Sequence, residues 1–201
     1  GSVDLKSQNG NIIINNIINN YNEKVLNELN KSDIGVQVND AGQVNLEAKN
    51  ISINGNQGIV VGTSAAKYSG DSEVNVKSVN INDITATTDG ISVTKTHKTS
   101  DTQNIVNLDA KENYITVYGN SVGSQLKGIG VNGGIINIGK DENIISDITD
   151  IQLIGNADKK AILYGVRAAT ATGIDKEEGQ VNIESKSINV TVVDNANGDL
   201  V

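Results

Sequence analysis

The acidic segment over residues 140–150, KDENIISDITD, contains the densest group of potential metal ligands in this sequence. Its four carboxylates belong to Asp141, Glu142, Asp147 and Asp150. Carboxylate oxygens suit hard cations such as calcium, which binds roughly six to eight oxygen ligands. The spacing matches no calcium-binding loop, however, and the Gly-Gly-x-Gly-x-Asp motif of calcium-binding β-rolls is missing. We therefore favour a solvated acidic loop inserted over 139–150, and we predict no metal site.

Two isolated basic residues are the next candidates for chemistry. His97 lies in the polar stretch TKTHKTSDTQ beside two lysines, and Arg167 is the single arginine of the chain. A catalytic histidine needs a second group that orients it, and a lone histidine between lysines is more typical of a solvated loop. Arg167 falls in a predicted loop over 165–180. We keep both residues as candidates for binding a partner, and we predict no catalytic residue and no cofactor.

A third candidate is the segment over 15–33, NNIINNYNEKVLNELNKSD. Its apolar residues follow the spacing of an amphipathic helix: Ile18, Tyr21, Val25 and Leu29. The favoured interpretation is a helical insertion that shields the side or end of the core. The alternative is a protruding recognition element, in which Tyr21, Lys24 and Glu28 would contact the partner.

Composition excludes several classes of protein. The chain has 201 residues, a formal net charge of -8 and no cysteine, so a basic nucleic-acid-binding surface, disulfides and thiolate metal sites are not expected. No apolar run approaches the roughly 20 residues that cross a bilayer. The apolar residues are almost all Ile, Val, Leu and Ala, with no Phe, Trp or Met. Small branched side chains favour strands around a thin core.

The elements that must position these residues repeat along the chain. An aliphatic-Asn-aliphatic pattern recurs at Val44-Asn45-Leu46, Val74-Asn75-Val76, Val106-Asn107-Leu108, Ile136-Asn137-Ile138 and Val181-Asn182-Ile183, with Val3-Asp4-Leu5 as a variant. The first four copies are spaced by 30, 32 and 30 residues, which is the signature of a repeat architecture.

Two further patterns follow the first in each repeat. The second, aliphatic-polar-aliphatic, occurs at Ile12-Ile13-Ile14, Ile51-Ser52-Ile53, Val79-Asn80-Ile81, Ile115-Thr116-Val117, Ile151-Gln152-Leu153 and Ile188-Asn189-Val190. The third, Gly-aliphatic-any-Val, begins at Gly35, Gly58, Gly90 and Gly128, with Ala161-Ile162-Leu163-Tyr164 as a looser copy. Six repeats of three short strands predict a single parallel β-helix of about six coils over 1–201.

The alternation of side chains predicts which residues stack on the surface. The asparagines of the first pattern point outward and form a polar ladder: Asn45, Asn75, Asn107, Asn137 and Asn182. A second asparagine row follows the second strand: Asn56, Asn120 and Asn156. Lys6, Glu47, Lys77 and Asp109 alternate in charge at the next outward position, and small residues come directly after them: Ser7, Ala48, Ser78, Ala110 and Ser185.

With these Val-Asn-Leu, Ile-Ser-Ile and Gly-Ile-x-Val strands, the chain resembles the right-handed β-helical passenger domains of Gram-negative autotransporters and the related filamentous-haemagglutinin-type adhesins. The likeness is one of repeat grammar and covers most of the chain outside the insertions. It implies an extracellular or cell-surface segment of a longer protein. Such a segment would present loops to host cells, other bacteria or its own kind in biofilm, without inserting into a membrane.

Other functions remain open from the sequence. A β-helical polysaccharide lyase or hydrolase would need clustered carboxylates, and the sequence shows no aspartate pair on adjacent repeats. A purely structural stalk spacer is the other alternative. The polar ladder also suggests lateral self-association of two rods, and we expect more coils to flank this segment in the full protein. The favoured function is non-enzymatic attachment to a protein or glycan on another surface.

Overall fold

The protein is all-β in the part of the chain that the structure covers. The computed structural model describes residues 1–15, 33–39, 41–63, 71–95, 103–119, 125–155, 162–170 and 178–194, none of which lies in a helix. All strand pairings among these residues are parallel. The predicted all-β class and parallel pairing are therefore confirmed. The helical insertion predicted over 15–33 falls, except for its first and last residues, outside the described residues.

The strands form two sheets. The five-stranded sheet contains β3 (Ile34–Asn39), β5 (Gln57–Thr63), β7 (Asp89–Lys95), β10 (Gln125–Asn132) and β13 (Ile162–Ala169). The ten-stranded sheet contains β1 (Ser2–Lys6), β2 (Asn11–Asn15), β4 (Gln43–Asn54), β6 (Ser72–Ala86), β8 (Asn104–Asp109), β9 (Glu112–Gly119), β11 (Gly134–Ile138), β12 (Ile148–Gly155), β14 (Gly179–Ile183) and β15 (Ser187–Asp194).

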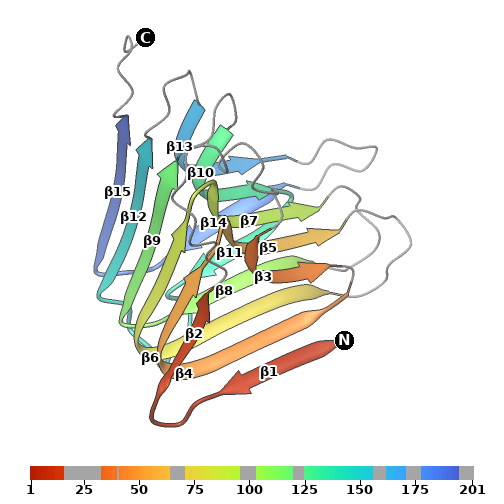
Figure 1. Cartoon of the computed structure of the whole chain (residues 1–201), viewed down its shortest axis with the longest axis vertical. Coiled ribbons are helices and arrows are strands. Elements are labelled where there is room, and N and C mark those ends of the chain that lie inside the picture. The colour runs from red at the N-terminus through yellow and green to blue at the C-terminus, as the bar shows by residue number, and fades with distance from the viewer. Residues whose placement is uncertain are drawn as a thin grey trace, which may run out of the picture.

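The ten-stranded sheet is strongly curled, and Figure 1 shows its two limbs facing different directions. The first limb contains β1, β8, β11, β14 and the first halves of β4 and β6. The second limb contains β2, β9, β12, β15 and the second halves of β4 and β6. We call the line where the limbs meet the bend; β4 and β6 run through it without a break.

The first sequence pattern pairs as predicted. Val44 lies opposite Val3 and Val74, and the row continues through Val106, Ile136 and Val181. Most of the aliphatic residues on either side of the asparagines are buried in the core, and Val44, Val181 and Ile183 are partly buried against it. Because residues about 30 apart occupy the same position in neighbouring strands, each repeat packs against the repeat before it.

The second pattern was aligned wrongly in the third repeat. The structure places Ile84, not Ile81, in line with Ile53 and Ile115, and Val79 is 61% exposed. β6 contains one more residue than β4 where both strands pass the bend, between the pairs Ala48–Ser78 and Asn50–Ile81. One extra residue reverses the alternation of side chains, so Val79-Asn80-Ile81 cannot form the inward row.

The same row requires a shift in three other repeats. Ile12 lies opposite Ile51, which lies in line with Asn82 and Asn113, and Ile188 lies opposite Thr149. The residues aligned with Ile151 are therefore Ile14, Ile53 and Val190, each two positions further along than the sequence pattern indicated.

Glycines at the start of the third pattern allow the two sheets to approach closely. A Cβ on Gly90 would lie 2.5 Å from Ile115 Cγ2, and one on Gly128 would lie 2.6 Å from Ile151 Cγ2. The fifth copy of this pattern is therefore Gly165-Val166, because Val166 pairs with Ile129. The predicted copy Ala161–Tyr164 was wrong. The predicted loop over 165–180 was wrong at both ends, since Gly165 to Ala169 belong to β13 and β14 begins at Gly179.

The core consists of a main cluster of mostly branched side chains and a smaller second cluster formed by Ala86, Val117, Leu126 and Leu153, with Leu163 packed against it. Its two ends expose the same inward-facing positions. In the first repeat Val3 is 51% exposed, and in the last repeat Ile188 and Val190 are 47% and 48% exposed. The equivalent residues of the middle repeats are fully buried because strands lie on both sides of them.

Candidate functional site

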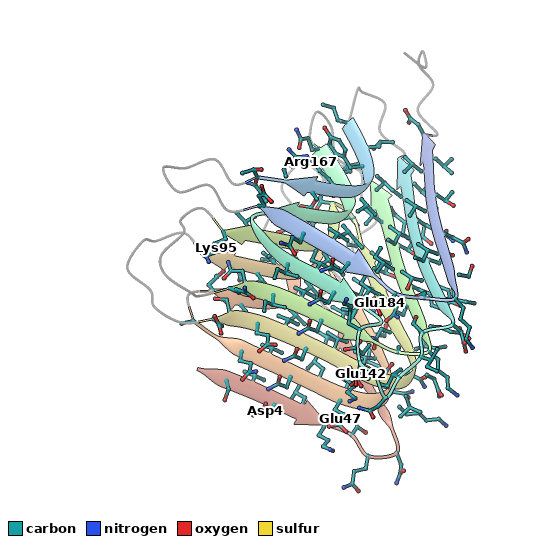
Figure 2. All side chains as sticks on the ribbon, turned by 180° about the vertical axis from the view of Figure 1, so that it is seen from behind. Asp4, Glu47, Lys95, Glu142, Arg167 and Glu184 are labelled. Carbon is teal, nitrogen blue, oxygen red and sulfur yellow. The ribbon has the colours of Figure 1, made fainter. Side chains whose placement is uncertain are left out.

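Only one of the five residues predicted to bind a partner lies in a described part of the chain. Tyr21, Lys24, Glu28 and His97 are outside the described residues. Arg167 is on β13 in the five-stranded sheet, and its guanidinium carbon lies 5.4 Å from the centre of the Tyr164 ring. This distance is within the range of a cation–π contact. Figure 2 shows Arg167 well away from Glu142 and the acidic segment.

Tyr164 ends a row of polar residues across the five-stranded sheet that also contains Gln57, Asp89 and Lys127. We call these four residues together with Arg167 the Arg167 cluster. Lys127 Nζ lies 3.2 Å from one oxygen of Asp89, and Gln57 Nε2 donates to the other oxygen at 3.1 Å. Lys127 and Gln57 thus each bind one oxygen of the Asp89 carboxylate. The Arg167 guanidinium lies over the face of the Tyr164 ring instead. The N–H groups at its edge can therefore donate to an anionic or polar ligand.

The asparagines of the first pattern form a ladder of amide hydrogen bonds on the outer face of the first limb. Each Nδ2 donates to the Oδ1 of the preceding repeat, at distances of 3.0 Å (Asn182 to Asn137), 2.9 Å (Asn137 to Asn107), 2.7 Å (Asn107 to Asn75), 2.9 Å (Asn75 to Asn45) and 2.5 Å (Asn45 to Asp4). All bonds run in one direction. The ladder ends on Asp4 because a carboxylate accepts hydrogen bonds but does not donate them.

The second asparagine row is described only at Asn56. Its main-chain carbonyl accepts hydrogen bonds from the N–H groups of Thr87 and Thr88 in the next repeat, and its side-chain oxygen accepts from the Thr87 hydroxyl. Asn120 and Asn156 lie outside the described residues. At this turn, asparagine and threonine therefore join neighbouring repeats.

Three of the four carboxylates of the acidic segment have separate partners. Asp141 pairs with Lys77, Asp147 lies 2.6 Å from Lys186, and Asp150 accepts a hydrogen bond from Gln152 at 2.9 Å. Hydrogen bonds from Lys77 and Lys186 hold the pKa of Asp141 and of Asp147, respectively, below the ordinary carboxyl value. No group of three or more His, Cys, Asp or Glu among the described residues is arranged to hold a metal ion.

The acidic segment folds back along the bend. Asp141 follows β11 of the fifth repeat, yet its partner Lys77 belongs to the third, and the Asp141 N–H donates to Asp109 of the fourth at 2.9 Å. Figure 2 shows Glu47, Glu142 and Glu184 along this same edge of the molecule. Beside the segment lies a cavity of about 340 Å³, whose lining includes Ile145, Glu184 and Lys186. The segment thus bridges three repeats rather than projecting freely.

A further polar surface on the second limb was not found from the sequence. We call it the Tyr114 face: Asp83, Glu112, Tyr114 and Asp150. Tyr114 lies between Asp83 and Asp150 in a row across three strands, and its hydroxyl donates to Glu112 at 2.8 Å. Burial raises the pKa of the Asp83 carboxyl, and the hydrogen bond to Glu112 raises the pKa of Tyr114.

The signal for the Tyr114 face was present in the sequence but depended on the alignment of the second pattern. With Val79-Asn80-Ile81 taken as the third copy, Asp83 falls after the strand. With Ile84 in line with Ile115, Asp83 moves into the same outward row as Tyr114.

No protein-family model matches the chain, and none of the curated proteins or solved structures compared with it is a match. Within the described ranges, no helix is long and apolar enough to cross a membrane.

Proposed function

We propose that the chain is a right-handed parallel β-helix of about six coils, with three strands in each coil, and that it serves as a non-enzymatic segment of a bacterial surface adhesin of the autotransporter passenger or filamentous-haemagglutinin type. The single observation that carries the proposal is the parallel register, which brings the same three positions of each repeat over those of the repeat before it. Such a column gives a rigid support for segments that differ between repeats.

The surface chemistry fits attachment. The Asn ladder and the ion pair between Lys6 and Glu47 at 2.8 Å join neighbouring repeats along the outside of the column. The Arg167 cluster offers a cation on the five-stranded sheet, where a receptor protein or an acidic glycan could bind it. The insertion over 15–33 is the second proposed contact. Lateral self-association of two columns through the Asn ladder remains part of this proposal.

Attachment can be tested with the 201-residue chain coupled to beads. We expect the beads to bind epithelial cells or bacteria, or to bind members of a glycan array, and we expect deletion of 17–31 or the substitution R167A to reduce binding. K111A, which removes an exposed lysine elsewhere, is the matched control and should bind as the unmodified chain does. Beads that bind no cell and no glycan would favour the structural spacer, and equal binding by all variants would refute the proposed contacts.

One observation favours a second candidate, a polysaccharide-processing β-helix. A glycosidase acid needs a carboxyl group with a raised pKa and a second carboxylate across the substrate; on the Tyr114 face burial raises the pKa of Asp83, and Asp150 lies two strands away, about 10 Å between Cα atoms. Release of reducing ends or unsaturated products from a panel of polysaccharides, abolished by D83N, would support this candidate. An adhesive but inactive protein would exclude it.

A further inference from the structure

Two neighbouring isoleucines of the acidic segment lie at the surface. Ile145 is 69% exposed, more than any other large hydrophobic side chain in the described ranges, and Ile144 is partly exposed. Both line the cavity of about 340 Å³ beside the segment. Ligand pockets range from about 300 to 1,000 Å³, so a cavity of this size suits one or two side chains of a partner. Ile145 gives it an exposed apolar wall.

The acidic segment is held in place on both sides of these isoleucines. Before them, the Asp141 N–H donates to Asp109 Oδ1 at 2.9 Å, and the Asp141 carbonyl accepts from the Ile144 N–H at 2.9 Å, which closes a turn. After them, the Asp147 N–H donates to the Lys111 carbonyl at 2.7 Å. A wall that is already ordered loses less conformational entropy when a partner binds.

The charges around the cavity leave one carboxylate without a cation. Five charged residues line it: Lys140, Asp141, Glu142, Glu184 and Lys186. Lys140 Nζ lies 2.5 Å from Glu184 Oε1, and Lys186 and Asp141 pair with residues outside the lining. The exposed Glu142 carboxylate has no hydrogen bond or ion pair to any residue that the structure describes. The cavity therefore favours a cationic occupant.

The Arg167 cluster has the matching properties. Within the described ranges Arg167 has no ion pair, because Asp89, the carboxylate of the cluster, binds Lys127 and Gln57. The Arg167 guanidinium lies over the Tyr164 ring, and both side chains are partly exposed. The cluster thus presents one unpaired cation beside an aromatic ring.

We propose that the Arg167 cluster of one copy of the chain docks against the cavity of a second copy, with Arg167 bound to Glu142 and the Tyr164 ring packed on Ile145. An arginine and a carboxylate can form two parallel hydrogen bonds, and arginine and aromatic side chains are enriched at protein interfaces. The chain itself supplies both halves of this contact, each with one unpaired charge of opposite sign. This complementarity favours a second copy over an unrelated partner.

The contact joins two different surfaces. Arg167 and Glu142 lie well apart in one molecule (Figure 2), so a copy that uses one surface keeps the other available. A contact of this kind is heterologous, and it builds a ring or an open chain of copies rather than a symmetric dimer. Such self-association goes beyond attachment to another surface and does not depend on it.

Reversing the two charges tests the contact. Sedimentation equilibrium in 0.15 M salt, where the Debye length is about 8 Å, limits the general repulsion between acidic copies. We expect the average mass of the unmodified chain to rise with concentration beyond that of a dimer. E142R and R167E should each abolish the rise, because like charges then meet. The double variant E142R/R167E should restore it, and so should an equal mixture of the two single variants.

Matched controls reverse exposed charges elsewhere in the chain. K49E and E178R change the net charge by the same amounts as R167E and E142R, and both should associate as the unmodified chain does. The proposal is overturned if the unmodified chain stays monomeric, or if the double variant stays monomeric with an unchanged urea midpoint. Association that survives E142R and stops at dimers would assign it to the Asn ladder and equally overturn the proposal. E142R keeps Arg167, so the bead assay tests attachment separately.

Discussion

Replacing one hydrogen-bond donor in the middle of the Asn ladder with an acceptor should destabilise the protein strongly. Asn107 Nδ2 donates to Asn75 Oδ1 at 2.7 Å and to Glu73 Oε1 at 3.1 Å, and its Oδ1 accepts from Asn137 Nδ2 at 2.9 Å. The substitution N107D keeps the shape of the side chain and the bond from Asn137. It replaces the two donated bonds with contacts between a carboxylate and two acceptors, one of them charged.

The expected loss follows from these contacts. Each donated bond contributes about 1 kcal/mol, and a like-charge pair on adjacent strands costs a further few tenths to 1 kcal/mol. N107D should therefore lower the free energy of unfolding by about 2–3 kcal/mol at pH 7. N182D, at the end of the ladder, loses only the bond to Asn137 and should cost about 1 kcal/mol.

Urea unfolding of the two variants and the unmodified protein measures both values. The carboxyl introduced at 107 faces acceptors, so its pKa is raised in the folded state. The loss in free energy of unfolding caused by N107D should then become smaller as the pH falls through that raised pKa, because the protonated carboxyl can donate a hydrogen bond again. The reasoning is refuted if N107D costs no more than N182D at pH 7, or if its deficit is the same in acid.

Two further variants test the bend and the approach of the two sheets. The pKa of Asp141 is lowered by its hydrogen bond from Lys77, so its stabilisation is complete above the ordinary carboxyl pKa and is lost as the pH falls through the lowered value. D141N should lower the free energy of unfolding by about 1 kcal/mol at neutral pH. Its urea midpoint should fall less in acid than that of the unmodified protein, and parallel plots of midpoint against pH would contradict this. G90A places a Cβ 2.5 Å from Ile115 Cγ2 and should cost about 1–3 kcal/mol in urea unfolding. G62A, whose Cβ would meet its nearest atom at 3.4 Å, should unfold as the unmodified protein does, and equal losses in both variants would argue against the close approach.

The repeat could be predicted where its residues are both aliphatic and evenly spaced. Val44 and Val74 are 30 residues apart, and the pairing of β4 with β6 stays in register from Val44–Val74 to Ala48–Ser78, so the sequence spacing and the register agree there. The pattern failed at Val79 because the extra residue of β6 lies within an unbroken strand. Val79, Ile81 and Ile84 all lie close to it, so aliphatic spacing alone does not show which of them faces the core.

Other features depend on contacts that local spacing does not encode. Asn82 and Asn113 occupy inward positions, where a search for aliphatic rows passes over them. The pairing of Asp141 with Lys77 joins residues 64 apart and depends on the path of the acidic segment along the bend. Arg167 was recognised as an isolated cation, but its position over Tyr164 depends on the glycine register of the five-stranded sheet.

The central claim is that equivalent residues of successive repeats lie directly over one another in one column. A crystal structure of the 201-residue chain tests this claim most directly. We predict that the Cα atom of Val74 lies about 5 Å from those of Val44 and Val106, with the chain winding in a right-handed sense from repeat to repeat. Antiparallel pairing of these strands, or two separate cores, would contradict the account.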